Sequence, residues 1–226
     1  KCCVHRKIWR SIVLQGIDYT GKLIGSIDFI EASWDRKWSE PGQFMIYMTL
    51  TEYNRLDGKG IKYVENVGRP ERGIIQKIEY QKETEGAFVT VRGFFVDKLL
   101  DFCAYRKTQV LKASNTESVK AAFLSYISNA NASVTVEGKT YKPVGAVNVK
   151  DESEYPASIE ISIEQGKQMG TALYEALSDS GYGVLAGVEG YPADDNSEAL
   201  NLSLNFRKGR QLTDDETGIF FGKAYN

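Results

Sequence analysis

Residues 33–50 read Ser33-Trp34-Asp35-Arg36-Lys37-Trp38-Ser39-Glu40-Pro41-Gly42-Gln43-Phe44-Met45-Ile46-Tyr47-Met48-Thr49-Leu50. The first ten residues are polar and contain two tryptophans, which is typical of a loop. In the remainder, Phe44, Ile46 and Met48 recur at every second position, the period of a half-buried β-strand. We therefore expect a loop that enters a strand over residues 43–50, followed by a short polar loop that ends in Gly60.

Similar stretches lie on both sides of this strand. We expect strands over residues 8–15, 22–32, 61–67, 72–80 and 88–95. Residues 16–21 and 83–86 supply turn residues, and the second of these turns makes a hairpin. Consecutive short strands joined by glycine-bearing turns predict a small antiparallel β-barrel. Apolar residues at positions 96, 99, 100 and 103 have helical spacing and predict a short helix that closes the barrel.

The pattern changes after residue 107. Asn115 or Thr116 begins a predicted helix, and a second helix is predicted over residues 166–181, with Gly181 as its C-cap. Strands are expected over residues 108–112, 133–136, 158–164, 183–189 and 200–207, and residues 144–149 have an extended pattern. The predicted fold class is α+β and mainly β, with a barrel domain over residues 1–108 and a smaller α+β domain over residues 109–210. Residues 211–226 are predicted to be a linker and the start of a further strand or second barrel.

Composition limits the classes of partner. The 28 basic and 30 acidic side chains give a net charge of −2, so double-stranded nucleic acid is not an expected partner, because phosphate binding relies on clustered Lys and Arg. No apolar stretch reaches the roughly 18 residues of a membrane helix, and we expect no signal peptide. The three cysteines cannot all pair within one chain, which favours reduced thiols and synthesis inside the cell.

Possible catalytic and ligand motifs are incomplete. His5 is the only histidine, and its terminal position suits neither a nucleophilic arrangement nor, with Cys2 and Cys3, a four-ligand zinc site. The residues Gly58-Lys59-Gly60 lack the rest of a phosphate-binding loop, so we interpret them as a turn. We predict no catalytic residue, no metal site and no cofactor.

Two acidic groups leave alternatives open. Glu160 and Glu164 lie four residues apart on a predicted strand and therefore share a face. Paired carboxylates are the groups that a glycosidase uses as acid and base, whereas the structural interpretation is a solvated strand face. The loop at residues 194–198 has oxygen ligands suitable for calcium but lacks EF-hand spacing, which favours a flexible acidic loop.

Aromatic side chains provide the remaining candidate site. Trp34 and Trp38 lie four residues apart, and Tyr191 precedes the acidic loop. Exposed aromatic rings stack on sugars or bury in subunit interfaces. The simpler interpretation is that each ring anchors its own loop to the predicted barrel. We retain Trp34, Trp38 and Tyr191 as possible interface or glycan contacts.

The order of these motifs resembles the phage tail hub proteins, the baseplate-hub and tail-associated proteins at the distal end of long-tailed phages and prophages. The resemblance covers about 70 residues, and the later part of the chain matches only in its order of elements. It depends on the run from Trp34 through Phe44, on Gly60-Ile61-Lys62-Tyr63-Val64, on Gly73-Ile74-Ile75-Gln76-Lys77-Ile78, and on Val89-Thr90-Val91-Arg92-Gly93 before Lys98-Leu99-Leu100.

This resemblance implies a structural role in the virion. Some members of the family carry a C-terminal cell-wall hydrolase, and we expect no such module within this chain. It implies that the full-length protein is a homotrimer at the tail tip, made in the bacterial cytoplasm, with distal tail and tape-measure proteins as neighbours. Two barrels per subunit would form a pseudo-sixfold ring, and residues 218–226 would begin the second barrel. The alternatives are a carbohydrate-binding module that contacts the host envelope and a glycosidase.

Overall fold

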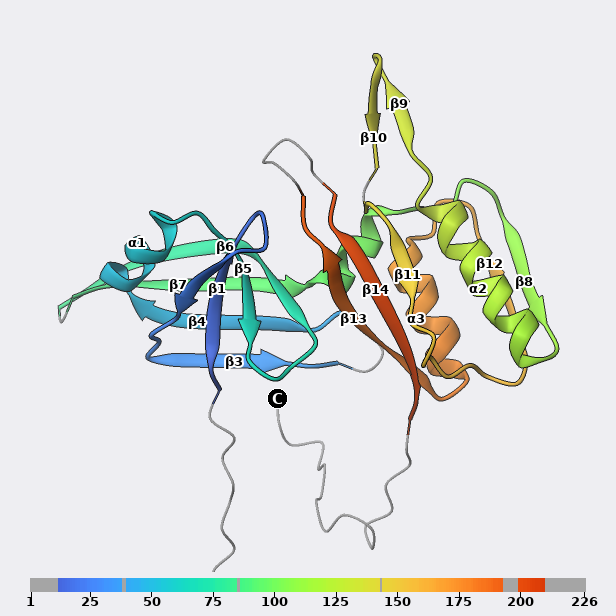
Figure 1. Cartoon of the computed structure of the whole chain (residues 1–226), viewed down its shortest axis with the longest axis horizontal. Coiled ribbons are helices and arrows are strands. Elements are labelled where there is room, and N and C mark those ends of the chain that lie inside the picture. The colour runs from blue at the N-terminus through green and yellow to red at the C-terminus, as the bar shows by residue number, and fades with distance from the viewer. Residues whose placement is uncertain (1–11, 38–39, 85, 143, 193–198, 210–226) are drawn as a thin grey trace, which may run out of the picture.

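The computed structural model describes residues 12–37, 40–84, 86–142, 144–192 and 199–209. These residues form two bodies that lie side by side (Figure 1). The first body (residues 12–95) is a large β-sheet with one helix, and the second body (residues 96–209) combines helices with smaller sheets. The structure is mainly β with four helices in its described part, which agrees with the predicted class.

The first body is built on a seven-stranded antiparallel sheet. Its strands are β1 (Leu14–Asp18), β2 (Leu23–Ser26), β3 (Glu31–Asp35), β4 (Gln43–Thr49), β5 (Ile61–Asn66), β6 (Arg72–Glu83) and β7 (Gly86–Phe95). They lie in the order β2-β1-β5-β6-β7-β4-β3. The sequence predicted β4 to β7 close to their observed positions, and the reason is clearest in β4, where Phe44, Ile46 and Met48 are buried and the residues between them are not.

The sheet is not closed, so the predicted closed barrel is wrong. Strands β2 and β3 form its two edges and do not pair with each other. The predicted single strand over residues 22–32 is two strands, because Ile27 turns into the core and is only 4% exposed. Residues 27–30 pass from one edge to the other: Ile27 N–H donates to Leu14 and Ile30 N–H donates to Tyr47. The sheet therefore curls without completing a hydrogen-bonded cylinder.

A helix replaces the predicted loop after β4. Helix α1 (Leu50–Asp57) begins where the Thr49 hydroxyl accepts a hydrogen bond from the Glu52 N–H at 3.2 Å, and it buries Tyr53 and Leu56. The sequence did not predict α1 because most of its residues are polar. A helix of eight residues depends on packing against the rest of the protein and not on helix propensity. Helix α1 lies at one end of the sheet body (Figure 1).

The second body contains three helices and three small sheets. The helices are the 3-10 helix η1 (Val96–Phe102), α2 (Thr116–Ala130) and α3 (Met169–Asp179). The strands are β8 (Gln109–Ala113), β9 (Val134–Val136), β10 (Lys139–Tyr141), β11 (Val147–Val149), β12 (Ile159–Ile163), β13 (Tyr182–Gly190) and β14 (Asn201–Lys208). They pair as β11-β14-β13, β12-β8 and β10-β9. Asn115 caps α2 through a reciprocal pair of hydrogen bonds with Ser118, which confirms the predicted start of this helix.

Two hydrophobic cores divide the buried residues. The first core contains residues of β1, β4, β5, β7 and α1 together with Ile27. The second core begins at Val96 and continues to Phe206, and it also takes Ile17 and Tyr63 from the first body. The helix predicted to close a barrel is therefore η1, but its buried side chains belong to the second core. The domain boundaries at residues 108 and 210 stay predictions, and residues 211–226 lie outside the described part of the chain.

Candidate assembly surfaces

A buried carboxyl group of the second body, that of Asp97, lies at the joint between the two bodies, where residues of both line one small cavity. Asp97 in η1 is 5% exposed and accepts a hydrogen bond from the hydroxyl of Tyr174 in α3. Burial raises the pKa of Asp97 to about 6, although the hydrogen bond from Tyr174 opposes the rise. The same burial raises the pKa of the Tyr174 hydroxyl. This pair holds η1 against α3 and fixes the start of the second body.

A second buried carboxylate lines the same joint. Glu71 is 5% exposed and forms an ion pair with Arg36 of the β3–β4 loop. Both residues line a cavity of ≈ 20 Å³ with Asp97 and residues of β13. That volume is enough for about one water molecule, and not for an organic ligand. We therefore interpret the joint as a structural contact between the bodies.

Trp34 lies in β3 and not in the predicted loop. Its indole ring stacks on Phe44 at 5.7 Å and lies 4.7 Å from Phe95 between ring centroids. The ring therefore covers one end of the first core, as expected for an anchoring aromatic side chain. Trp38 lies outside the described residues.

Tyr191 joins the two bodies at another point. Its ring packs edge-on against Tyr63 of β5 with 5.3 Å between centroids, and a side chain at Gly21 would collide with it. Burial raises the pKa of the Tyr191 hydroxyl. Trp34 and Tyr191 thus each pack against aromatic partners of the first body. Their role as interface or glycan contacts stays a prediction.

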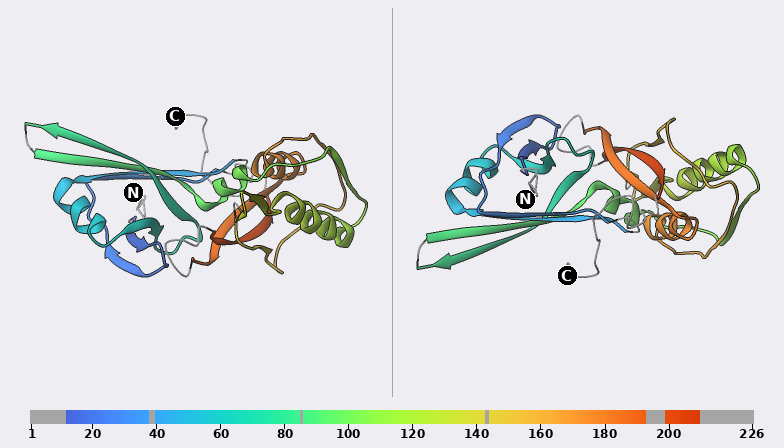
Figure 2. Two further views of the ribbon diagram at one scale, coloured as in Figure 1. Left: turned by 90° about the horizontal axis from the view of Figure 1, so that it is seen from above. Right: turned by 90° about the horizontal axis from the view of Figure 1, so that it is seen from below.

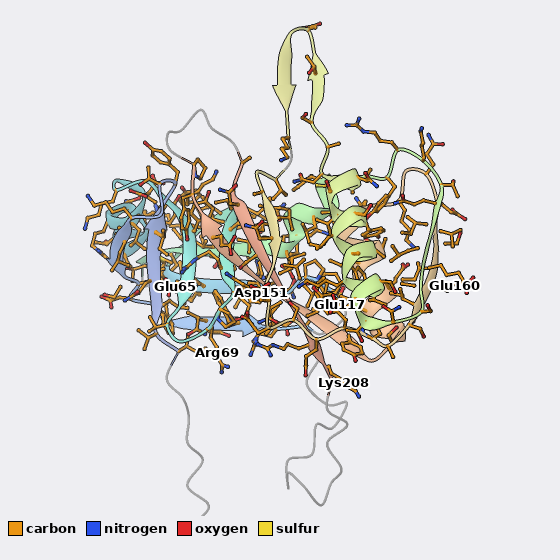
Figure 3. All side chains as sticks on the ribbon, turned by 45° about the vertical axis from the view of Figure 1, so that its right-hand side comes forward. Glu65, Arg69, Glu117, Asp151, Glu160 and Lys208 are labelled. Atoms are coloured by element: carbon orange, nitrogen blue, oxygen red, sulfur yellow. The ribbon has the colours of Figure 1, made fainter. Side chains whose placement is uncertain are left out.

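The acidic pair is on the outer surface of the second body. Glu160 in β12 is opposite Lys112 in β8, and their side chains form an ion pair at 2.9 Å. Glu164 follows the end of β12 and is exposed. Figure 3 shows Glu160 at the far end of the molecule, away from Glu65 of the first body. Glu160 and Glu164 are therefore placed as solvated surface charges. The catalytic acid of a glycosidase, in contrast, lies in an apolar pocket that keeps it protonated.

The other sequence motifs have local structural roles. Gly60 has a φ of 73° in the turn between α1 and β5, and Gly181 has a φ of 76° just after α3, as predicted for a residue that ends a helix. His5, Cys2, Cys3 and residues 194–198 lie outside the described residues. Among the described residues, no group of three or more His, Cys, Asp or Glu side chains is arranged to hold a metal ion. The described helices include none of the length and apolarity needed to cross a bilayer.

One surface was not predicted from the sequence, the open edge of β6. Strand β5 pairs only with residues 72–74 of β6, whereas β6 continues to Glu83 and pairs along its other side with β7. Ile78 is 37% exposed and Tyr80 is 64% exposed beside this open edge. The available signal was the alternation of Ile78 and Tyr80 beyond the length of β5. An open strand edge with exposed apolar side chains is a surface suited to pairing with another chain.

Comparison with known proteins finds partial matches among solved structures. Prophage tail protein gp18 from Listeria monocytogenes EGD-e aligns with 85% of this chain and 50% of its own, at 9% identity and a TM-score of 0.47. The tail protein from Neisseria meningitidis MC58 aligns with 84% of this chain and 50% of its own, at 16% identity and a TM-score of 0.48. The chain thus spans about half the length of each of these two proteins. No protein-family model matches the chain, and no curated protein does.

Proposed function

We propose that this chain is a structural protein of a phage or prophage tail, and that it forms part of the distal tail hub through assembly with other subunits. The full-length protein would be a homotrimer at the tail tip, in contact with distal tail and tape-measure proteins. Its role would be to hold subunits together and not to catalyse a reaction. The support comes from the motifs that resemble tail hub proteins and from what these motifs do in the fold.

The observation that carries the proposal is the role of the motif glycines. A side chain at Gly73, the first residue of the Gly-Ile-Ile-Gln-Lys-Ile motif, would lie 2.5 Å from the ring of Phe44. A side chain at Gly93, the last residue of the Val-Thr-Val-Arg-Gly motif, would lie 2.6 Å from the same ring. The Phe44 ring therefore occupies space that both glycines leave free, and Phe44 itself ends the first of the quoted runs, which begins at Trp34. Three separated parts of the resemblance meet at one packing site.

The open strand edges agree with an assembly role. Strand edges of soluble proteins are usually protected, because unpaired N–H and C=O groups pair with other chains. Among the described residues, β3 has an open edge, and so does the outer half of β6 (residues 76–83), which extends beyond its pairing with β5. A hub subunit has a use for such edges, since it must join neighbours tightly.

Localisation in particles tests the proposal. Purified particles from an induced host should contain the chain by mass spectrometry, and an antibody against it should label the tail tip in electron micrographs. An antibody against the major capsid protein, which labels heads, is the matched control. Absence of the chain from purified particles, or its presence only in the soluble host fraction, would contradict the proposal.

A further inference from the structure

The outer half of β6 lacks a partner on one side. Strand β6 has twelve residues and β5 has six, and their ladder stops at the pair Tyr63–Ile74. From residue 76 to residue 83, no described strand pairs with this side of β6. Figure 2 shows the β6–β7 hairpin projecting beyond the rest of the sheet. A row of unpaired backbone groups about eight residues long is a template for an added strand.

Two apolar side chains beside this edge, Ile78 and Tyr80, are exposed to solvent. Ile78 is opposite Val91, and Tyr80 is opposite Val89, in the β6–β7 ladder. Val91 is 2% exposed and Val89 is fully buried, so Ile78 and Tyr80 are on the core-side face of the sheet. They nevertheless stay largely exposed, because β5 does not extend beside this part of β6; the Tyr80 ring has one edge-on contact, with Tyr53 of α1 at 5.8 Å between centroids. An added strand would bury both.

Strand β3 is the complementary edge. It pairs with β4 on one side only, and no described strand pairs with its other side. Ala32 and Trp34 are opposite Ile46 and Phe44, which are buried, and therefore face the core. The residues on the outward face of β3 are Glu31, Ser33 and Asp35.

We propose that β3 of a second copy of this chain pairs antiparallel with the open edge of β6. This deepens the assembly role given under the proposed function and rests on it. One chain cannot make the contact alone, because its own β3 is separated from β6 by β7 and β4 in the sheet order. The contact is therefore head-to-tail, the kind that generates rings when the rotation closes.

The charges of the side chains and the faces of the sheet on which they lie together favour one register of β6 against β3. Directly opposite residues share a face, so core-side residues must meet core-side residues. The pairs, with β6 of one copy first and β3 of the second copy after it, are Lys77–Asp35, Ile78–Trp34, Glu79–Ser33, Tyr80–Ala32 and Gln81–Glu31. Lys77 then meets an opposite charge, and Ile78 and Tyr80 meet apolar side chains. A shift of two residues either way places Glu79 opposite Asp35 or Glu31 of the second copy, where like charges repel.

Paired cysteines test the contact and its direction. In the full chain with Cys2→Ser and Cys3→Ser, the Asp35→Cys and Lys77→Cys substitutions together should give a ladder of disulfide-linked dimers and higher species under mild oxidation. The matched control combines Glu31→Cys with Lys77→Cys. In the antiparallel contact these two positions lie four residues out of register, so this pair should not form a disulfide. A parallel contact would reverse the two results and overturn the proposal. No cross-linking by either pair at the highest soluble concentration would also overturn it.

A charge exchange provides an independent readout by sedimentation equilibrium. Lys77→Glu should raise the dissociation constant for self-association roughly fivefold, as expected for replacing a cross-strand attraction with a repulsion. Adding Asp35→Lys should restore it. Lys62→Glu is the control, since Lys62 is exposed on the interior strand β5. Equal effects of Lys77→Glu and Lys62→Glu would contradict the contact.

The two levels of the proposal fail separately. Labelling of particles reports where the chain resides, whereas cysteine pairing reports which edges meet. A chain found at the tail tip whose Asp35→Cys/Lys77→Cys form does not cross-link keeps its proposed function and loses the β6–β3 contact.

Discussion

The space around Phe44 gives a quantitative test of why the sequence motifs contain glycine. The atoms nearest to a Cβ at Gly73 would be those of the Phe44 ring, with Cε1 at 2.5 Å and Cδ1 at 2.7 Å. A Cβ at Gly93 would meet the same ring at 2.6 Å and also the backbone oxygen of Ile74 at 1.9 Å. The first obstacle is a side chain that a second mutation can remove. The second is a strand backbone that cannot move without breaking the β6–β7 ladder.

We expect Gly73→Ala to lower the free energy of unfolding by about 2 kcal/mol, in the range of an overpacked core. Phe44→Leu alone should cost about 1 kcal/mol. Because Leu frees the space that the new methyl needs, the double variant should lose about 1 kcal/mol less than the sum of the single variants. Gly93→Ala should cost about 3 kcal/mol or more, and Phe44→Leu should not rescue it, because the Ile74 carbonyl remains in place.

Urea unfolding followed by tryptophan fluorescence and circular dichroism measures these values. Gly58→Ala is the control, since Gly58 has a φ of −60° and its Cβ would approach no atom closer than 3.2 Å; we expect a change within about 0.5 kcal/mol. Equal rescue of Gly73→Ala and Gly93→Ala by Phe44→Leu would refute the assignment of different obstacles. Free energies of both glycine variants equal to that of the parent chain would refute the steric explanation altogether.

Three further predictions concern the joint and helix α2. Burial raises the folded-state pKa of Asp97 from 3.8 to about 6, so ionisation of Asp97 destabilises the fold. The free energy of unfolding should therefore fall by about 2 kcal/mol from pH 4 to pH 7. Asp97→Asn, which keeps an acceptor for Tyr174, should remove that part of the pH dependence measured by urea unfolding; an unchanged profile would contradict the assignment. Arg36→Ala should cost about 3 kcal/mol by leaving the Glu71 carboxylate buried without its cation, and adding Glu71→Gln should recover part of this in the same assay; no recovery would indicate lost packing instead. Asn115→Ala should lower the thermal midpoint by an amount equivalent to about 1 kcal/mol, whereas Asn115→Ser should preserve it; equal losses would exclude the cap.

The sequence predicts individual elements better than their assembly. Alternation identified β4 and β7 because their buried faces are continuous, and Asn115 marked the start of α2 because its side chain satisfies helical N–H groups locally. Closure of the sheet could not be predicted in the same way. Whether edges meet depends on pairing between strands far apart in the chain, and alternation contains no information on strand order. Ile27 shows the consequence, since its inward turn ends β2 and separates the two edges.

Single candidate residues could be chosen from the sequence, but the surfaces that they belong to could not, because these also depend on which strands pair. Trp34 was identified as a candidate contact from its residue type, but it was placed in a loop because the polar residues around it concealed the strand β3. Tyr191 was identified in the same way, and its partner Tyr63 lies far away in the sequence. The open edge of β6 depends on a difference in length between two neighbouring strands, which only the observed ladder reveals. Single residues could thus be selected from the sequence, whereas the surface they belong to could not.

A reconstruction of the intact tail tip by electron cryomicroscopy, at a resolution that separates strands, tests the assembly role of this chain. The proposal predicts density at the tip into which the seven-stranded sheet fits as three copies around the tail axis, with the outer half of β6 against a neighbouring strand. A tip whose density is fully accounted for by other proteins would contradict it.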